Sequence, residues 1–376
     1  MRPAPLPCRM RLGPVRSAPS VHPSFLLFYA LLSAALLPSS SPQPPTTQLH
    51  AGGAINIFSR YGYLSISIRV VPRNDSEPWV FREPMVDVFR DTPPALPIKK
   101  PPQKDRSLVF DGDFHMEFCD DVRQLMQAYF RDFSIERLSE PWRAFAGSWG
   151  RAAIARHLGL NATFVGGQHC YVLVRVARRR TIANLAIPGL GVYTPETVDG
   201  PVLTEPVAKE IESVHPGNAA SVDKFVRSFG SHYVSSYVTG NSLYQVFVYT
   251  PSIYSKIKER LRTRGVAELT RAELASFFSP WYAEHTGKIQ VASGNSTVAA
   301  WAEEKLRISF YFFSFASLLR LHGDARLLRR LDALLGDEAL LQLQLKSLAP
   351  AFHNPTTRKW FEEVLDNRLR LWEANM

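Results

Sequence analysis

The residues in this chain most suited to chemistry are a neighbouring serine and histidine, Ser231 and His232, and a group of acids upstream. These acids are Asp111, Asp113, Glu117, Asp120 and Asp121. A serine beside a histidine is the type of pair that forms a nucleophile and its base. A group of carboxylates is the type of cluster that holds calcium.

The spacing of these residues opposes both kinds of chemistry. Successive strand residues point to opposite faces, so we expect the side chains of Ser231 and His232 to face apart. The sequence has no G-x-S-x-G, H-E-x-x-H, P-loop or dinucleotide-binding motif. The acids lack the spacing of a known calcium loop, and acids at a helix N-terminus explain two of them without a metal. We therefore predict no catalytic residue, metal or cofactor, and a buried, hydrogen-bonded His232 at a helix–strand junction.

Residues 1–40 have the composition of a secretory signal peptide. Four arginines and no acid accompany a thirteen-residue apolar run, Phe25–Leu37, which Pro38 and small residues follow. The run is shorter than the about 20 residues that span a bilayer, and the alternative is a buried N-terminal helix. Met10 is an alternative start of the chain. Removal of residues 1–40 lowers the formal net charge from +10 to +6. This mild, scattered surplus does not indicate nucleic-acid binding, and we expect a secreted, extracellular protein.

Secretion bears on the cysteines and on three glycosylation sequons. Cys8 would leave with the signal peptide, and Cys119 and Cys170 would remain. In an oxidising compartment such a pair is most simply a disulfide, which would stabilise by about 4 kcal/mol in the chain-entropy model. Two buried free thiols are the alternative. The sequons begin at Asn74, Asn161 and Asn295.

Hydrophobic periodicity predicts a mixture of strands and helices. Strands are predicted at residues 64–70 and Cys170–Ala177, and helices at residues 122–133, 142–149, 221–229 and 252–278. Ser221 or Asp223 is the predicted cap of the third helix. The apolar run 308–319 is predicted to be a core element, and helices continue to residue 376. We interpret Arg178–Arg180 as a strand end, with a protease processing site as the alternative.

The stretch Phe229–Asn241 joins a helix to an unusually long strand. Gly230 is predicted to end the helix, because glycine adopts the left-handed conformation at little cost. Residues 234–250 are strand-like on both sides of Gly240, whereas most strands have about 5–6 residues. A glycine inside such a strand marks a bulge, a bend or a close backbone approach. We therefore predict a bend near Gly240.

These residues resemble the signature of the membrane attack complex/perforin (MACPF) family. The matching residues are Phe229, Gly230, Ser231, His232, Tyr233 and Gly240. Asn241 stands where the family usually has a second glycine, and asparagine tolerates positive φ better than most residues. The resemblance covers about residues 55–321. It implies a strongly bent, four-stranded antiparallel sheet flanked by two helical clusters, an α+β fold in which the signature is a structural hinge.

This resemblance divides the chain into four parts. They are a signal peptide (1–40), a low-complexity linker (41–54), a MACPF-like domain (55–321) and a helical C-terminal extension (322–376). We find none of the cysteine-rich or lipid-binding modules that accompany the domain in perforins and complement components. A secreted, cysteine-poor, nearly stand-alone domain is most similar to the Torso-like branch of insects. That similarity implies a non-enzymatic developmental factor acting upstream of the Torso receptor tyrosine kinase and its Trunk-type ligand, at the eggshell matrix or plasma membrane surface.

Two other function classes remain open. A pore-former would refold both helical clusters into membrane hairpins, which need alternating segments of about 10 residues, and it would oligomerise. Residues 115–165 and 252–286 have helical periodicity instead. The second segment also carries five basic residues, Lys256, Lys258, Arg260, Arg262 and Arg264. The other class is a secreted enzyme, for which the sequence supplies no catalytic constellation.

Overall fold

The computed structural model describes residues 49–59, 85–98, 114–185, 202–264, 271–310, 313–322 and 324–375. All of them belong to one unit, Pro44–Met376. Several predictions lie outside the described residues: the signal peptide, the strand at 64–70, Asn74, Asp111 and Asp113. Within the described ranges, no helix combines the length and apolar character that crossing a bilayer requires.

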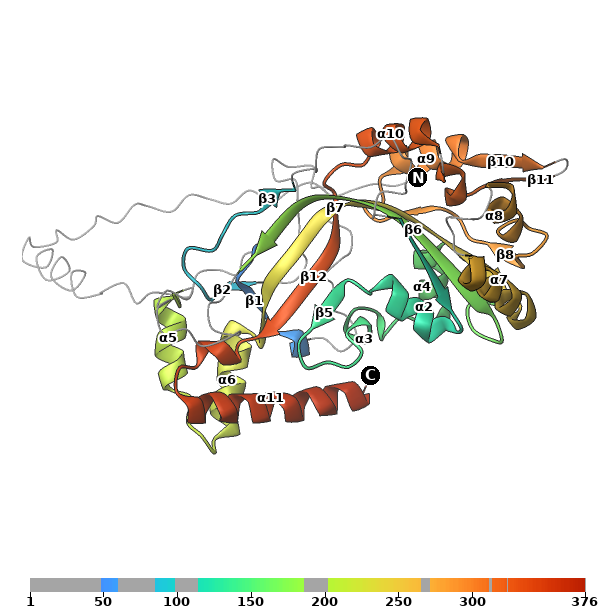
Figure 1. The fold of residues 1–376 in the computed structure, drawn as a ribbon. Coiled ribbons are helices and arrows are strands. Elements are labelled where there is room, and N and C mark those ends of the chain that lie inside the picture. Colours follow the sequence, from blue (N-terminus) through green and yellow to red (C-terminus); the bar gives the residue numbers. More distant parts are fainter. Residues whose placement is uncertain are drawn as a thin grey trace, which may run out of the picture. The chain divides into compact units, whose positions relative to one another are not determined.

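Two long antiparallel strands form the centre of the fold (Figure 1). They are β6 (Cys170–Asn184) and β7 (His232–Tyr249), which pair along most of their lengths. The outer edge of β6 pairs with β4 (Phe114–Cys119) and β3 (Leu96–Pro97). Beyond the end of β6, β1 (Gly53–Ile55) pairs with the same edge of β7, and β2 (Val86–Asp87) pairs with β1. The predicted α+β class with an antiparallel sheet is confirmed.

The other edge of β7 pairs with three separate strands. Its second half pairs with β8 (His285–Thr286) and β9 (Gln290–Val291), and its first half pairs with β12 (Ala339–Ser347). On its far side β12 pairs in parallel with the short β5 (Phe133–Ile135). Four lines of strands cross the sheet: β4 with β3, β6 with β1, β7, and β8 and β9 with β12. With β5 beyond the fourth line the sheet has ten strands within the described residues, so the predicted count of four is too low.

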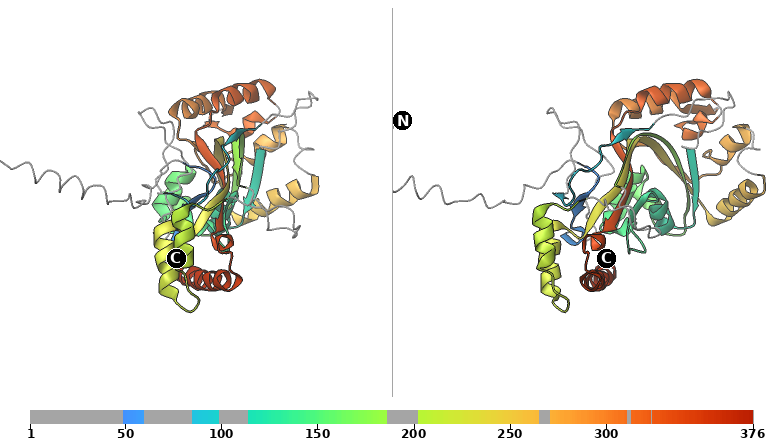
Figure 2. Two further views of the ribbon diagram at one scale, coloured as in Figure 1. Left: turned by 90° about the vertical axis from the view of Figure 1, so that its left-hand side faces the viewer. Right: turned by 60° about the vertical axis from the view of Figure 1, so that its left-hand side comes forward.

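β6 and β7 curve together, so the sheet is strongly bent (Figures 1 and 2). Two irregularities mark the position of the bend. In β6 the register shifts between Arg179 and Thr181, and in β12 it shifts between Leu340 and Gln342. Both shifts lie beside the residues that pair with Thr239 of β7. Each of the two neighbouring strands, β6 and β12, therefore has one extra residue at this position. An extra residue makes a β-bulge, which bends its strand and increases the local twist. The bend therefore lies beside Gly240, as predicted.

Helices cover both faces of the sheet. One group consists of α2 (Val122–Tyr129), α3 (Trp142–Ala146) and α4 (Arg151–Leu158). The other consists of α7 (Pro251–Arg264) and α8 (Arg271–Phe277), with α9 (Ser296–Lys305) and α10 (Ala325–Leu334). The first group shares a hydrophobic core with Tyr171 and Leu173, and the second shares another core with Val172 and Val174. Because strand residues alternate, the two groups lie on opposite faces.

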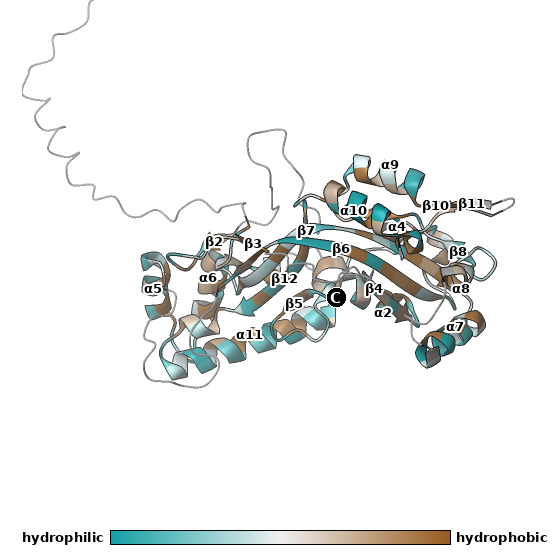
Figure 3. Ribbon diagram, turned by 45° about the horizontal axis from the view of Figure 1, so that its top comes forward, coloured by the Kyte–Doolittle hydropathy of each residue, from teal (hydrophilic) through white to brown (hydrophobic). Residues whose placement is uncertain are grey.

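A third group of helices lies at the start of β7. It contains α5 (Glu205–Glu212), α6 (Ala219–Phe229) and α11 (Pro355–Asn375). The N-cap of α6 is Asn218, which accepts hydrogen bonds from two backbone N–H groups, so the predicted cap at Ser221 or Asp223 is wrong. In Figure 3 α11 alternates hydrophilic and hydrophobic patches, as expected for a helix with one buried face. Its Phe361 packs against Phe225 of α6.

The segment 322–376 is helical only in part. Between α10 and α11 it contributes β12, a strand of the main sheet, so the prediction of a wholly helical extension is wrong. The apolar run 308–319 is also only partly a core element. Most of it forms β10 (Arg307–Phe310) and β11 (Phe313–Ala316), a separate two-stranded hairpin. Leu318 and Leu319, in the short 3-10 helix η4 (Leu318–Leu321), are buried.

Candidate functional site

The signature begins where α6 ends. Gly230 has φ +90° and ψ 174°, a combination open essentially only to glycine, although it is extended in ψ rather than left-handed helical as predicted. A Cβ at this position would lie 2.8 Å from the carbonyl carbon of Ile55 in β1. Backbone conformation and close approach of a second chain segment therefore both require glycine.

Ser231 and His232 do not face apart. The imidazole Nδ1 lies 3.0 Å from Ser231 Oγ, because Ser231 precedes the first residue of β7 and strand alternation does not apply to it. The backbone N–H of Ile57 donates to Ser231 Oγ at 3.3 Å. His232 Nε2 lies 3.3 Å from the backbone carbonyl of Glu136. In a neutral imidazole Nε2–H donates to that carbonyl, which leaves Nδ1 to accept from the serine hydroxyl.

The Ser231–His232 pair is enclosed. Both side chains are 0% exposed. Burial lowers the pKa of His232 to about 4, and the hydrogen bond to the Glu136 carbonyl opposes this only in part. A base needs a substrate within hydrogen-bond reach, and a triad needs a carboxylate on the imidazole; here a backbone carbonyl takes that position. The geometry is that of a structural junction.

Glu136 connects this junction to β12. Its carbonyl accepts from His232, its backbone N–H donates to the carbonyl of Leu345 at 2.9 Å, and its carboxylate accepts from the backbone N–H of Ser347 at 2.7 Å. The backbone N–H of Leu348 donates a hydrogen bond to the carbonyl of Ser231 at 3.0 Å. The signature histidine thus joins β7 to the segment after β5 and to the end of β12.

Position 240 requires glycine because the backbone of β6 comes very close to it. It is not among the described glycines with positive φ. A Cβ on it would overlap the carbonyl oxygen of Arg178 in β6. The interpretation of Asn241 through positive φ is also wrong, since Asn241 does not have one either.

Asn241 instead uses its side chain, which is fully buried. Its Oδ1 accepts from the N–H of Ser242 at 2.9 Å and from that of Ser293 at 3.2 Å. Its Nδ2 donates to Ser293 Oγ at 2.9 Å and to Glu338 Oε2 at 3.3 Å. These bonds satisfy the amide, and they give a reason for asparagine where the family signature has glycine.

The basic run Arg178–Arg180 lies inside β6, so its interpretation as a strand end is wrong. Arg178 Nε lies 3.1 Å from Asp332 Oδ1. A guanidinium nitrogen of Arg180 donates to the carbonyls of Asp332 at 2.6 Å and Leu335 at 2.8 Å. Cations are favourable at the C-terminal end of a helix, and the run holds that end of α10 against the bend. A protease would have to unpair β6 to cleave here.

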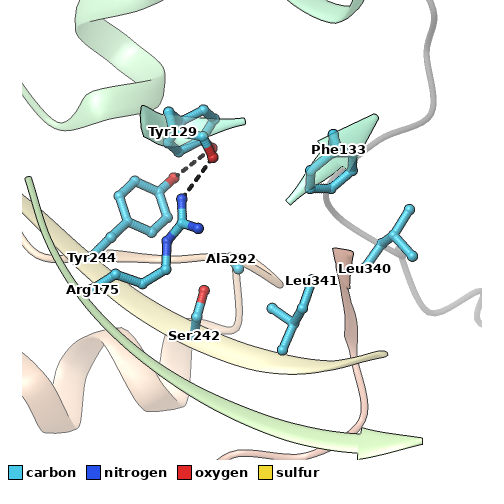
Figure 4. A pocket seen from close by; sticks show the side chains of 8 residues that line it. All are labelled: Tyr129, Phe133, Arg175, Ser242, Tyr244, Ala292, Leu340 and Leu341. Atoms are coloured by element: carbon cyan, nitrogen blue, oxygen red, sulfur yellow. Dashed lines mark hydrogen bonds between the residues drawn. The ribbon is translucent and has the colours of Figure 1, made fainter. Parts of the chain in front are cut away.

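A small cavity lies between the first helical group and the bend (Figure 4). Its volume is about 20 Å³. Its lining residues are Tyr129, Phe133, Arg175, Ser242, Tyr244, Ala292, Leu340 and Leu341. Arg175 donates to the carbonyl of Tyr129 at 2.7 Å, and the hydroxyls of Tyr129 and Tyr244 lie 3.1 Å apart. The space suits a single water molecule, whereas ligand pockets usually measure about 300–1,000 Å³.

The acids of the predicted cluster serve separate purposes. Glu117 pairs with Arg131 at 3.0 Å, and Asp121 caps α2 by accepting from the N–H of Gln124 at 2.7 Å. Asp120 accepts from the hydroxyl of Tyr254 at 2.6 Å and from Lys258 Nζ at 2.8 Å, both on α7. The hydrogen bond from Lys258 is the largest cause that lowers the pKa of Asp120. In the part of the chain that the structure describes, no three side chains form a candidate metal site.

The predicted disulfide is not formed. Cys119 and Cys170 are free and buried. The register pairs Cys119 with Tyr171, so the two cysteines are one residue out of alignment. Their side chains lie in hydrophobic cores on opposite faces of the sheet. Burial raises the pKa of the Cys119 thiol to about 12.

Two of the three predicted glycosylation sites are described. Asn161 is exposed at the start of the 3-10 helix η2 (Ala162–Phe164). Asn295 is half-buried and caps α9. Its Nδ2, the atom to which a glycan would attach, donates to both carboxylate oxygens of Glu338 at 3.1 Å each.

Three solved structures resemble this fold. The first is GNIP1Aa from Chromobacterium piscinae, with 10% identity and a TM-score of 0.43 over 85% of this chain and 57% of that chain. The second, a Bacteroides thetaiotaomicron protein with a MAC/perforin domain, has 9% identity and a TM-score of 0.34 over 87% and 63%. The third is Astrotactin-2, a vertebrate-specific, perforin-like membrane protein involved in neuronal development, with 10% identity and a TM-score of 0.33 over 80% and 96%.

This chain spans less than two thirds of the first two proteins. No protein-family model and no curated protein matches the sequence. At these identities and TM-scores, the likeness carries nothing about activity, substrates or partners.

Proposed function

We propose that this chain is a secreted protein of the MACPF/perforin family that acts outside the cell without enzymatic activity and without lysing membranes. The observation that carries the proposal is the position of the signature in the fold. Phe229–Tyr233 opens the central strand, and Gly240 lies beside the paired bulges at the bend. The match of Gly240 to the signature coincides with a physical need for glycine, namely the space taken by the Arg178 carbonyl.

The contacts of the helical groups favour a protein that does not insert. Asp120, at the entrance to α2, receives hydrogen bonds from Tyr254 and Lys258 of α7, so the two groups are tied together at one end of the sheet. The inner face of α7 is buried through Tyr254, Ile257 and Leu261. Refolding either group into a membrane hairpin would break this tie, and refolding the second group would also expose that face.

The outer face of α7 is basic, with Lys256, Arg260 and Arg262 exposed. On the lipid face of a barrel each would cost about 2–4 kcal/mol near the midplane. At an anionic membrane surface each basic residue contributes about 1 kcal/mol of attraction, which salt screens. Trp281 and Tyr282 are exposed, the Tyr282 ring contacts Phe277, and Arg260 of α7 lies over the same Phe277 ring. Aromatic rings suit the interfacial region of a membrane.

The finer function within this class follows from the resemblance to the Torso-like branch. We expect an extracellular developmental factor that acts upstream of a Torso-type receptor tyrosine kinase and its Trunk-type ligand, at a matrix or membrane surface. Purified protein added to cells that express such a receptor and ligand should raise receptor phosphorylation. No rise at saturating ligand precursor would contradict this finer function without affecting the broader one.

The broader proposal is tested with anionic and neutral liposomes at low and physiological salt, by measuring binding and dye release. We expect salt-sensitive binding to anionic vesicles and no release. The paired change Arg260→Glu and Arg262→Glu should weaken binding, whereas Arg326→Glu and Arg329→Glu on α10, a control at two other exposed arginines, should have a smaller effect. Rapid release with ring-shaped oligomers would establish a pore-former instead.

A further inference from the structure

The fourth line of strands is interrupted at the bend by a 45-residue insertion, residues 293–337. The insertion contains α9, the β10–β11 hairpin, η4 and α10. Its two ends return to neighbouring positions of β7. The N–H of Ala292 donates to the carbonyl of Ser242 at 2.8 Å, and that of Glu338 donates to the carbonyl of Gly240 at 3.0 Å. Asn241 lies between these two positions.

Side chains close the gap between the two ends. Asn241 binds Ser293 on one end and Glu338 on the other. Asn295 Nδ2 completes the connection, because it donates to both oxygens of the Glu338 carboxylate. The N–H of Asn295 donates to Ser293 Oγ at 3.2 Å. The four residues therefore form a closed ring of hydrogen bonds around the base of the insertion.

Asn295 is also the N-cap residue of α9. Its Oδ1 caps α9 by accepting from the N–H groups of Thr297 at 2.9 Å and Val298 at 3.4 Å. Both ends of its amide are therefore committed in the folded chain. An N-glycan would replace one hydrogen of Nδ2 and place a sugar against the Glu338 carboxylate, at a half-buried position.

We propose that Asn241, Ser293, Asn295 and Glu338 form a latch that holds the base of the 293–337 insertion against the bend, and that an N-glycan on Asn295 keeps this latch open. The glycan part rests on the extracellular location in the proposed function, whereas the latch does not. The sequon then acts as a modification site that selects between two states of the insertion.

An open latch leaves the insertion attached elsewhere. Gln245 of β7 donates to the carbonyl of Ala316 at 2.9 Å and accepts from the N–H of Leu318 at 2.9 Å. Arg180 holds the end of α10 through the carbonyl of Leu335. The effect of opening is therefore local to the base, which separates it from general unfolding.

The latch is tested by amide hydrogen exchange on protein produced in bacteria, where no glycan is added. In Glu338→Ala the amides of Ser293, Thr297 and Val298 should exchange about tenfold faster or more, because hydrogen bonds to a charged group are lost. Glu338→Gln keeps one acceptor oxygen and should restore part of the protection. Glu303→Ala, at an exposed acid on α9, should change nothing, and the amide of Leu318 should stay protected in all variants. Unchanged exchange in Glu338→Ala would overturn the latch.

The glycan part is tested on protein secreted from eukaryotic cells, with occupancy of Asn295 measured by peptide mass spectrometry. Thr297→Ala removes the sequon and keeps both Asn295 and the backbone N–H of residue 297. Chains with a glycan at Asn295 should exchange like Glu338→Ala, and Thr297→Ala chains should be protected. Wild-type chains without a glycan should also be protected. Protected amides in glycosylated chains, or unprotected amides in unglycosylated ones, would overturn the proposal, and neither result depends on activity.

Discussion

The carbonyl oxygen of Arg178 occupies the space that a side chain at Gly240 would need. The two residues belong to neighbouring strands, and the bulges that bend the sheet lie one position away, on both sides of Thr239. The bend therefore depends on a contact between two backbones. This contact leads to the first prediction.

Gly240→Ala should destabilise the fold by about 1–3 kcal/mol, and Gly240→Val by more, because an overfilled site forces the backbones apart. Thermal unfolding and secretion yield measure the effect. Gly150→Ala is the matched control, since a Cβ there would contact nothing within 4 Å and should be tolerated. Equal stability of Gly240→Ala and Gly150→Ala would show that the close approach is absent in solution.

The second prediction concerns pH. Burial lowers the pKa of His232 to about 4, against about 6.5 for an unperturbed histidine. The folded-state pKa is depressed, so protonation favours unfolding. The stability that neutral His232 contributes is complete above about pH 6.5 and falls by about 3 kcal/mol as the pH drops to 4. His232→Gln cannot take up this proton, so its stability should depend less on pH across this window. His353→Gln, at an exposed histidine, should behave like the wild type.

His232→Ala should cost about 1–3 kcal/mol at neutral pH, because it leaves the Glu136 carbonyl without its buried donor and removes the imidazole nitrogen that accepts from the Ser231 hydroxyl. Chemical denaturation measures this loss. A His232→Ala variant that folds and is secreted normally but has lost its activity would instead revive an active-site role for the pair.

The fourth prediction is that Cys119 and Cys170 are reduced thiols in the native protein. Both should resist alkylation while the chain is folded, because each is buried and burial raises both thiol pKa values. Both should react fully after denaturation without reductant, and reductant should not change the melting temperature. A peptide pair linked through these cysteines in secreted protein would contradict the register observed between β4 and β6.

The fifth prediction compares two neighbouring residues of α11. Trp372 is 1% exposed and packs against Phe58 at 6.3 Å between ring centroids, whereas Leu371 is 66% exposed. Trp372→Ala should destabilise the whole domain by about 3–5 kcal/mol, and Leu371→Ala by less than about 0.5 kcal/mol. Unfolding followed by two probes should give one coincident transition. A separate transition for Trp372→Ala would mean that the last helix unfolds as a unit of its own.

Local patterns in the sequence predicted the elements that hold the signature. The apolar spacing of Phe225, Val226 and Phe229 marked α6, and alternation on both sides of Gly240 marked the long strand β7. β12 was missed although Leu341, Leu343 and Leu345 alternate with glutamines, a strand pattern that lies between two helical segments. That alternation was the available signal for a fourth strand.

Contacts between distant residues could not be predicted from one sequence. Glu136 meets His232 across 96 positions, and Glu338 meets Asn241 across 97. Neither acid belongs to a sequence motif. Glu136 contacts His232 through its backbone carbonyl and Glu338 contacts the side-chain amide of Asn241, and only the folded sheet brings these groups together. For Gly240 the sequence left a bulge, a bend and a close backbone approach open, and only the folded sheet identifies the approaching group as the Arg178 carbonyl.

The position of β12 affects how the chain is made. During synthesis the first half of β7, His232–Gly240, leaves the ribosome about 100 residues before Ala339–Ser347, its partner on that edge. At about 5–20 residues per second, this edge stays unpaired for roughly 5–20 seconds. An unpaired strand edge is a template for pairing with other chains. Nascent molecules of this protein therefore pass through a period in which they are open to misassembly, and it ends only when residue 347 has emerged.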